Sequence, residues 1–437
     1  MALPRFKQGF GQVNWQFSPK QLLAMYWWNL PQYQGCNGIL AHGAIRSGKT
    51  IAMIFGWVQW SMKNFNGQMF GMAGKTIKTF KINVLKPMET ICHYLGIKYA
   101  YNRTDSIVTL RDNAGRTNYY VVYGAKDEGS QDVVQGATFA GFFFDEVVLM
   151  PQSFVDQAIG RLSVTGAKYW MNCNPAGPAN YVKEGIVDQY VRKKVLIMHF
   201  LMDDNLSLSL ERREFYAAQY TGIFYRRNIL GEWCLAEGLV YSAFDGEKMI
   251  FHNEVDYDQY DRLIVGYDYG IQNPTAFVML GYNADEECID VVKSWSYSGR
   301  DTQAQKTDNE LYDDLEAFIG DAPVSYVYGD PSATSFHIQI QKAGVYSDRK
   351  ADNDVVPGIS FVSQLFNVGQ LRIHESCTDL IKELGMYAWD EEKSQREGHD
   401  CVVKQFDHSC DALRYAIYTY FKPRCRDYGL AYFKEAG

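Results

Sequence analysis

The feature that most constrains this chain is residues 43–50, Gly-Ala-Ile-Arg-Ser-Gly-Lys-Thr, which fit the phosphate-loop pattern G-x-x-x-x-G-K-[ST]. The apolar run at 38–41 predicts a strand before the loop, and 51–60 predicts a helix after it. Such a loop turns backbone N–H groups toward phosphate oxygens, and the helix N-terminus favours their negative charge. The sequence therefore predicts an ATP site. We expect Gly43, Ser47 and Gly48 to line this site. Lys49 is expected to reach the β- and γ-phosphates, and Thr50 to bind Mg²⁺.

A second nucleotide-site pattern is the apolar run at 139–144, which ends in Asp145 and Glu146. A buried strand that delivers two acids in this order is the Walker B arrangement. There Asp145 is expected to hold Mg²⁺ through water, and Glu146 to polarise the attacking water. A predicted strand at 167–173 leads into Asn174. An amide beyond the strand next to Walker B suits a sensor of the γ-phosphate.

The opening segment predicts a helix that Ser18 caps, with Pro19 in its first turn. Gln21 has two interpretations. Its amide can read an adenine edge, as a glutamine upstream of the phosphate loop does in many ATP-driven DNA motors, or it can be an ordinary helix-surface residue.

The first half alternates strand-like and helix-like segments, which predicts a mostly parallel sheet with helices on both faces, the doubly wound α/β class. Further expected strands are 68–73, 117–123 and 195–200. Expected helices are 76–94, broken near Pro87, then 151–162 and 207–220.

The second half opens with a strand at 263–267 that ends in Asp268. Strands at 275–281 and 288–295 predict an antiparallel meander, and a helix at 303–319 precedes a strand at 324–329 that ends in Asp330. A helix is expected from 407 to about 421.

Three separated carboxylates, two at strand ends and one on a late helix, are typical of a ribonuclease-H-like nuclease, in which they converge on two divalent cations, Mg²⁺ or Mn²⁺. The late helix offers Asp407, His408 and Asp411 on one face, since they lie three or four residues apart. A capping role explains Asp407 equally simply, so the choice between Asp407 and Asp411 as metal ligand stays open.

The chain divides at a turn-rich, acidic stretch. We expect a P-loop ATPase domain at 1–232, a linker at 233–261, and a ribonuclease-H-like α/β nuclease domain at 262–437. The net charge of −8 neither indicates nor excludes nucleic-acid binding. The nine cysteines form no C-x-x-C pairs, which favours reduced thiols and no structural zinc site. No signal region or membrane-spanning run is expected.

The order of these motifs resembles the large terminase subunit of tailed bacteriophages. The resemblance rests on the phosphate loop, Phe144-Asp145-Glu146, the run from Gly266 to Gly270, and residues 407–416. The last run, Asp-His-Ser-Cys-Asp-Ala-Leu-Arg-Tyr-Ala, is similar to the signature of the headful-cutting branch. The resemblance to this family implies a motor that uses ATP to move double-stranded DNA through the portal into the procapsid and then cuts concatemeric DNA. The implied partners are the portal protein and a small terminase subunit, with a ring of five on the portal. The implied location is the host cytoplasm, with no secretion and no membrane association.

The resemblance also implies residue roles. Arg46 matches a phosphate-loop arginine that acts in cis, and Arg161 lies where some members supply an arginine to a neighbour's ATP. Asn174 falls in the coupling region. Asp268, Asp330 and Asp411 match the nuclease acids, and His408 matches the residue beside them. The stretch 390–404 is either a hairpin flanking the nuclease site or a solvated loop.

Two other classes of protein share part of this pattern. A DNA helicase or repair ATPase with an appended nuclease would share the phosphate loop but would need further helicase motifs after Asn174, which we do not find. A non-catalytic assembly protein would keep degenerate sites, whereas every expected acid is present here.

Overall fold

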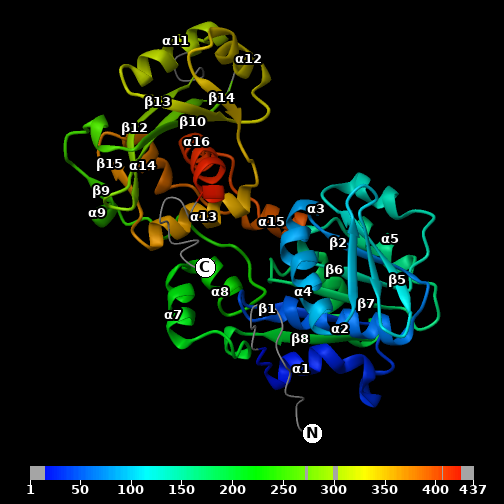
Figure 1. Cartoon of the computed structure of the whole chain (residues 1–437). Helices are drawn as coiled ribbons and strands as arrows, with labels where there is room; N and C mark the ends of the chain where they lie inside the picture. The colour runs from blue at the N-terminus through cyan, green and yellow to red at the C-terminus, as the bar shows by residue number, and fades with distance from the viewer. Residues whose placement is uncertain (1–14, 271–273, 299–303, 406, 425–437) are drawn as a thin grey trace. The chain divides into compact units, whose positions relative to one another are not determined.

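The chain folds into two units that alternate along the sequence (Figure 1). A computed structural model describes residues 15–270, 274–298, 304–405 and 407–424. The first unit comprises Met1–Glu214 and Arg226–Cys234, and the second comprises Phe215–Tyr225 and Leu235–Gly437. In the second unit Asn367 Nδ2 donates to the Gln219 carbonyl at 3.0 Å, and Thr221 Oγ1 donates to Asn367 Oδ1 at 3.1 Å. These bonds attach the short 215–225 segment to the body of that unit.

The first unit is built on an eight-stranded sheet in the order β3-β4-β5-β2-β6-β7-β1-β8. The strands are β1 (Gly38–Gly43), β2 (Met69–Gly74), β3 (Lys98–Asn102), β4 (Ile107–Arg111), β5 (Thr117–Gly124), β6 (Gly141–Phe144), β7 (Lys168–Cys173) and β8 (Val195–Phe200). All neighbours are parallel except β3–β4 and β4–β5. The predicted parallel sheet is therefore confirmed, with an antiparallel edge that was not predicted.

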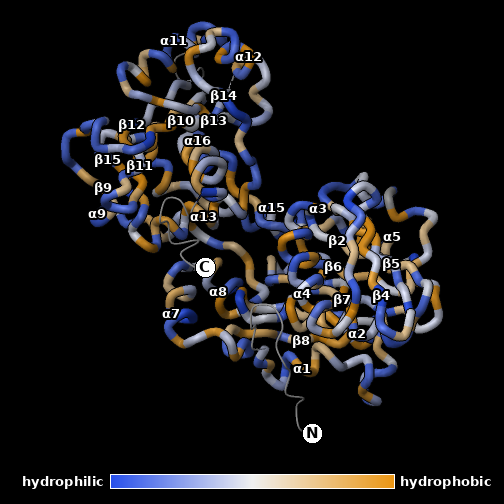
Figure 2. The backbone as a smooth tube through the Cα atoms, in the orientation of Figure 1, coloured by the Kyte–Doolittle hydropathy of each residue, from blue (hydrophilic) through white to orange (hydrophobic). Residues whose placement is uncertain are grey.

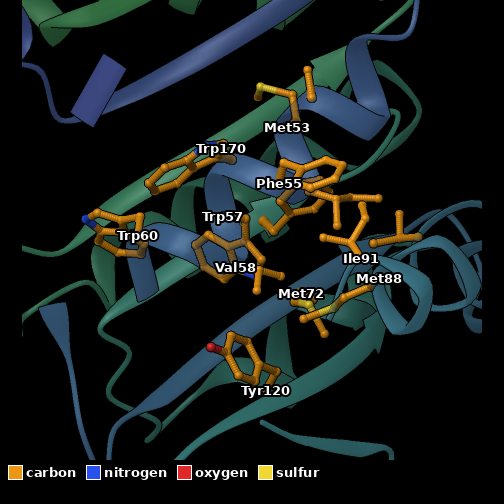
Figure 3. Close-up of a cluster of buried hydrophobic side chains, with 14 of the residues drawn as sticks. Met53, Phe55, Trp57, Val58, Trp60, Met72, Met88, Ile91, Tyr120 and Trp170 are labelled. Carbon is orange, nitrogen blue, oxygen red and sulfur yellow. The ribbon is translucent and has the colours of Figure 1, made fainter. Parts of the chain in front are cut away.

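Both faces of this sheet are buried, which explains the continuous apolar strands. In β6 the side chain of Phe143 joins the core on one face, while Phe142 and Phe144 join the core on the other. On the first face Trp57 and Trp60 pack against Trp170 of β7, with ring centroids 5.3 and 4.6 Å apart (Figure 3). Hydrophobic positions run through the interior of each unit (Figure 2).

The helices of the first unit mostly fall where the sequence predicts them. They are α1 (Pro19–Tyr26), α2 (Lys49–Asn64), α3 (Ile77–Phe80), α4 (Lys86–Tyr94), α5 (Gln152–Gly160) and α6 (Tyr190–Lys193). Two helices are shared between the units: α7 (Leu210–Ala218) begins in the first unit, and α8 (Gly222–Asn228) ends in it. The expected break near Pro87 takes the form of an irregular turn within the helical segment, not of an end to it. A π-helical turn, Lys81–Leu85, joins α3 to α4, and Pro87 lies in the first turn of α4. The wider turn accommodates the missing proline N–H without ending the helix.

The second unit is built on a seven-stranded sheet in the order β14-β13-β10-β11-β12-β15-β9. The strands are β9 (Ile250–Phe251), β10 (Arg262–Asp268), β11 (Thr275–Asn283), β12 (Cys288–Tyr297), β13 (Val324–Gly329), β14 (Ser347–Lys350) and β15 (Leu371–His374). The expected meander is confirmed, since β10, β11 and β12 pair antiparallel. The other neighbours are parallel.

Helices cover both faces of this sheet. They are α9 (Gly246–Met249), α11 (Asp308–Ile319), α12 (Thr334–Ala343), α13 (Val355–Asn367), α14 (Thr378–Leu384), α15 (Glu391–Glu397) and α16 (His408–Ala416), which continues as a π-helical turn, Ile417–Phe421. The start of the expected 303–319 helix lies partly outside the described residues. The helix itself begins at Asp308, because Thr307 and Glu310 form a capping box.

Helix α16 crosses β10 at very close range. A Cβ atom on Gly266 would lie only 2.0 Å from the Ala412 carbonyl oxygen, so only glycine fits beneath the helix. The opposite face of the strand carries Val265 and Tyr267, which pack against residues of α11 and α12. Glycine at this one position therefore brings α16 down onto the sheet.

Two expected irregular segments have defined structure. Residues 235–261, expected as part of a linker, belong to the second unit, where β9 pairs with β15 and Tyr241 is buried against Tyr387. Residues 390–404 are neither a hairpin nor simply a solvated loop. They contain α15, capped by Asp390, and a bridge between Trp389 and Val402 closes the segment.

Eight of the cysteines lie in the described part of the chain, and all eight are free thiols. Within the same residues, no helix is both long and apolar enough to cross a membrane.

Candidate functional site

The phosphate loop has the backbone that its glycines permit. Gly48 has φ 75°, and a Cβ atom there would lie 2.2 Å from Gln21 Nε2. Gly43 has φ 138° and packs directly on Phe200 of β8. Ser47 is buried, and its Oγ donates to the Ala44 carbonyl at 2.9 Å, which holds the loop in a tight turn. The loop is thus preformed, with Thr50 half-buried in the first turn of α2.

The side chain of Lys49 is buried inside this loop. Its Nζ donates to Asn174 Oδ1 at 2.7 Å and to the Ala44 carbonyl at 2.9 Å. Burial lowers the pKa of Lys49 to about 8, against the opposing charges of Asp145 and Glu146. The ammonium is therefore still charged at neutral pH, and the predicted sensor amide contacts the predicted phosphate ligand directly.

The two Walker B acids follow β6 as expected. Asp145 is buried, and burial together with the charge of Glu146 raises the pKa of Asp145 to about 7. Glu146 has φ 57°, and its backbone N–H donates to Asn172 Oδ1 at 3.2 Å. The role of Asn172, on the neighbouring strand β7, was not predicted. A lone amide inside an apolar strand was the available signal.

Gln21 lies against the phosphate loop rather than on the surface. It is 3% exposed, its Oε1 accepts from the Ser18 N–H at 3.0 Å, and its Nε2 donates to the Ser47 carbonyl at 3.4 Å. The helix-surface interpretation is therefore wrong. The capping box of α1 fixes the amide next to the loop.

The nuclease acids are brought together by strand pairing and by α16. Tyr267 of β10 pairs with Gly329 of the parallel strand β13, so Asp268 and Asp330 leave the sheet at the same edge. Burial raises the pKa of Asp268 to about 6; the bond from His408 opposes this shift, and Asp411 and Asp330 add to it. Carboxylates from three distant parts of the chain therefore share one electrostatic environment.

Three basic side chains lie among these acids. His408 Nδ1 is 2.8 Å from Asp268 Oδ2, and Arg414 pairs with Asp411 at 2.9 Å. Lys404 Nζ lies 3.1 Å from Asp407 and 3.2 Å from Asp411, so it bridges the two. Burial lowers the pKa of His408, but the hydrogen bond and charge of Asp268 outweigh that effect and raise it.

Asp407 does not cap α16 with its side chain, although it occupies the N-cap position. Its carboxylate is buried and contacts Lys404 instead. The simple capping explanation is therefore wrong. Asp411 is also buried, and its backbone N–H donates to the Asp407 carbonyl at 2.7 Å.

Comparisons with known proteins agree with this pair of sites. Residues 40–248 match the family described as terminase large subunit, T4likevirus-type, N-terminal. The chain is 43% identical to the large terminase of a thermophilic bacteriophage, covering 93% of this chain and 100% of that chain, with a TM-score of 0.89. The chain belongs to the phage large terminases. Structures of the same thermophilic-phage protein with ADP and with ATP-gamma-S give TM-scores of 0.87 and 0.86, each at 42% identity over 93% of this chain and 100% of that chain.

A more distant large terminase matches most of this chain. The terminase large subunit of Escherichia phage T5 is 24% identical over 419 residues, covering 88% of this chain and 93% of that protein. Large terminases are phage DNA-packaging ATPases that carry a nuclease domain, and they act on DNA with the rest of the packaging machinery. The helicase or repair ATPase and the non-catalytic assembly protein are thereby set aside.

The two arginines of this large terminase occupy different settings. Arg46 is exposed on the phosphate loop with φ 54°, and its carbonyl accepts from Asn205 Nδ2 at 2.8 Å. Arg161 is half-buried at the C-cap of α5, and its carbonyl accepts from the Phe139 N–H at 3.0 Å. A guanidinium at a helix C-terminus also suits a purely structural role, so the trans role of Arg161 remains a prediction.

A buried network behind Asp330 was not predicted. His337 Nε2 lies 2.9 Å from the Asp330 carbonyl, and His337 Nδ1 lies 2.7 Å from Asp348 Oδ2. The hydroxyl of Tyr267, the neighbour of Asp268, donates to Asp348 at 2.9 Å. Asp348 and His337 are almost fully buried. The network therefore ties the Asp330 carbonyl, and the side chain of Tyr267 just before Asp268, to the edge strand β14.

Proposed function

We propose that the first unit hydrolyses ATP with Lys49 on the β- and γ-phosphates, Asn174 as the sensor that contacts Lys49, and Glu146 orienting the attacking water. The contact between Lys49 and Asn174 carries the proposal, because it joins the phosphate ligand to the strand beside the Walker B acids. Binding of ADP and ATP-gamma-S by the related thermophilic-phage protein supports it. Gly43, Ser47 and Gly48 would cradle the phosphates, Arg46 would act on them in cis, and Arg161 would act on a neighbour's ATP.

A magnesium ion suits this loop because Asp145 is a buried carboxyl beside a second acid. Thr50 and Asp145 would hold it, and when bound it would neutralise charge on the phosphates. Gln21 is fixed next to the loop and is proposed to contact the adenine.

We propose that the second unit cuts the packaged DNA with Asp268, Asp330 and Asp411. Two divalent cations, Mg²⁺ or Mn²⁺, fit a donor set made only of carboxylates, and when bound they supply Lewis acidity for phosphodiester hydrolysis. Asp407 is a further candidate ligand for them. His408 would orient Asp268 through their 2.8 Å bond, and Lys404 and Arg414 would hold Asp411 between them.

The cellular location and the partners are proposed from membership of the large terminase family. We propose that the protein acts in the host cytoplasm, docks transiently on the procapsid as a ring of five at the portal, and receives double-stranded DNA from a small terminase subunit. The signature at 407–416 supports cutting by a headful rule.

The test separates the two activities in the full-length protein. Glu146→Gln should retain ATP binding and lose at least about 100-fold in turnover, because the carboxylate that orients the water is gone while Lys49 remains. Asp268→Asn should abolish DNA cutting and leave ATP turnover intact. Glu89→Gln, which changes an exposed acid of α4, is the control.

Phosphate release, binding of a fluorescent ATP analogue and plasmid cleavage are the three measurements. Near-normal turnover by Glu146→Gln would show that another residue orients the water, and cleavage by Asp268→Asn would show that Asp268 is not an essential nuclease acid. Either result leaves the other assignment standing.

A further inference from the structure

We propose that Glu397, His399 and Cys401 form a binding site for a zinc-class transition-metal ion, separate from the residues assigned to ATP hydrolysis and DNA cutting. One ligand atom from each of these three side chains lies within 4.8 Å of the other two. Among the described residues, this is the group of His, Cys, Asp or Glu side chains that meets that condition. The three nuclease acids do not converge to that degree.

Two of the three ligand–ligand distances match those of a tetrahedral zinc site, and the third, between His399 Nε2 and Cys401 Sγ, is below 4.8 Å. His399 Nε2 lies 3.4 Å from Glu397 Oε2, and Cys401 Sγ lies 3.4 Å from the same oxygen. Usual zinc bond lengths and tetrahedral angles place a nitrogen and an oxygen ligand about 3.3 Å apart, and a sulfur and an oxygen ligand about 3.5 Å apart. The side chains would therefore need little rearrangement to bind the ion.

The second nitrogen of His399 supports the same assignment. Nδ1 lies 3.1 Å from the Glu397 carbonyl oxygen, which can only accept, so Nδ1 carries a proton. Nε2 is then the ring nitrogen left to bind a metal ion, and it lies beside a carboxylate oxygen that can bind the same ion. An N–H to carbonyl bond is also the usual outer contact of a zinc-bound histidine.

The backbone around the group is well fixed. Helix α15 ends at Glu397, and Gly398 adopts φ 69°, which turns the chain out of the helix. The Cys401 N–H donates to Ser394 Oγ at 2.8 Å, and the Cys401 carbonyl accepts from the Asp390 N–H at 2.9 Å. The ligands are therefore held on a closed segment rather than on a free loop.

Exposure of the three side chains suits an open site. Cys401 is 8% exposed, while the side chains of His399 and Glu397 are 66% and 34% exposed. The ion would have protein on one side and water as its fourth ligand on the other. A thiolate with an imidazole selects zinc over magnesium, in contrast to the oxygen-only nuclease acids. Binding replaces the thiol proton, which passes to the solvent.

The lack of a C-x-x-C pair led to the expectation that the chain has no structural zinc site. The E-x-H-x-C spacing escapes that criterion because its ligands are mixed. Cys401 lies three residues before Lys404, which bridges Asp407 and Asp411. A bound ion would therefore fix the segment that leads to the nuclease acids.

Cobalt titration of the full-length protein, reduced and stripped with a chelator, tests the site. We expect one equivalent of Co²⁺ to give a thiolate-to-cobalt charge-transfer band that Zn²⁺ removes. Cobalt at the carboxylate sites gives no such band, because those sites contain no sulfur. Cys401→Ser should abolish the band, and His399→Asn should weaken cobalt binding about tenfold or more.

Matched controls are Cys36→Ser, which removes a half-buried thiol elsewhere, and Glu392→Gln, which removes an exposed acid of α15. Both should keep the band. Because His399 is exposed, His399→Asn decides the matter if Cys401→Ser fails to fold. The proposal is overturned if no band forms at one equivalent, if the band survives Cys401→Ser, or if His399→Asn binds cobalt as the parent does.

Discussion

At the residue scale, the ATP site depends on the charge of one buried amine. Burial lowers the pKa of Lys49 to about 8, although Cys173, Asp145 and Glu146 oppose that shift. Its Nζ also contacts the neutral amide of Asn174, and His42 interacts with it electrostatically. Deprotonated Lys49 cannot pair with a phosphate. ATP affinity should therefore be constant near pH 7 and fall above pH 8, by about tenfold per pH unit once the amine is mostly neutral.

Nucleotide binding measured from pH 7 to 9.5 checks this expectation. Lys49→Arg is the control, since a guanidinium stays charged throughout that range and its affinity should be nearly independent of pH. A decline of equal size in both proteins would show that Lys49 is not the titrating group.

The network behind Asp330 gives a second prediction at this scale. Asp348→Asn replaces a carboxylate that contacts both Tyr267 and His337, so the support of the Asp330 backbone is weakened. We expect the divalent-metal concentration for half-maximal DNA cutting to rise about 10- to 100-fold, with ATP turnover unchanged. Asp313→Asn, an exposed acid of α11, is the control. An unchanged metal requirement would mean that the network does not position Asp330.

At the scale of the element, the close packing of α16 on β10 depends on Gly266. Gly266→Ala puts a methyl group about 2 Å from the Ala412 carbonyl, so the helix carrying His408 and Asp411 must shift. We expect a loss of about 1–3 kcal/mol in the free energy of unfolding, as in other overpacked cores, and loss of DNA cutting.

Denaturant unfolding and plasmid cleavage measure these two effects. The control is Gly385→Ala, where the added methyl would lie 3.5 Å from its nearest neighbour, an ordinary contact. Retention of parental stability and cutting by Gly266→Ala would contradict the close crossing.

Elements with strong local patterns were predictable from the sequence. β6 reads as an unbroken apolar run and β10 ends in its acid, so both motifs were found. The β3–β4 pair was missed because its strands have only five residues each, lie toward one edge of the sheet, and β3 has no fully buried residue. The turn-rich, acidic composition of residues 235–261 predicts a linker, because β9 has only two residues and pairs with β15, far along the chain.

Site residues that act through distant partners were missed for a similar reason. Lys404 and His337 have no local pattern that marks them, since each matters through a contact that only the fold creates. Arg414 lies three residues from Asp411 within the quoted signature, so its spacing was visible.

At the scale of the whole molecule, the boundary of the second unit determines which fragments fold. The Val240 N–H donates to the Tyr387 carbonyl at 2.8 Å, and Tyr241 packs against Tyr387 and Phe366. A fragment that starts at residue 258 loses these contacts and β9. We expect a fragment starting at 235 to unfold at a clearly higher temperature and to cut DNA without ATPase activity.

Thermal unfolding and plasmid cleavage of the two fragments decide this point. Equal unfolding temperatures would show that residues 235–257 add nothing to the unit, and they would restore the sequence-based boundary. Failure of both fragments to fold would show that the unit also requires residues 215–225.

The interleaving of the two units constrains how such genes can recombine. The chain passes between the units after Glu214, after Tyr225 and again after Cys234. A single genetic crossover at the last junction would leave residues 215–225 from one parent packed on a nuclease from the other. The hybrid would lose stability where the incoming nuclease lacks a residue that can replace Asn367 in its bonds to Gln219 and Thr221. Viable exchange between phages is therefore expected to carry the 215–225 segment together with the nuclease.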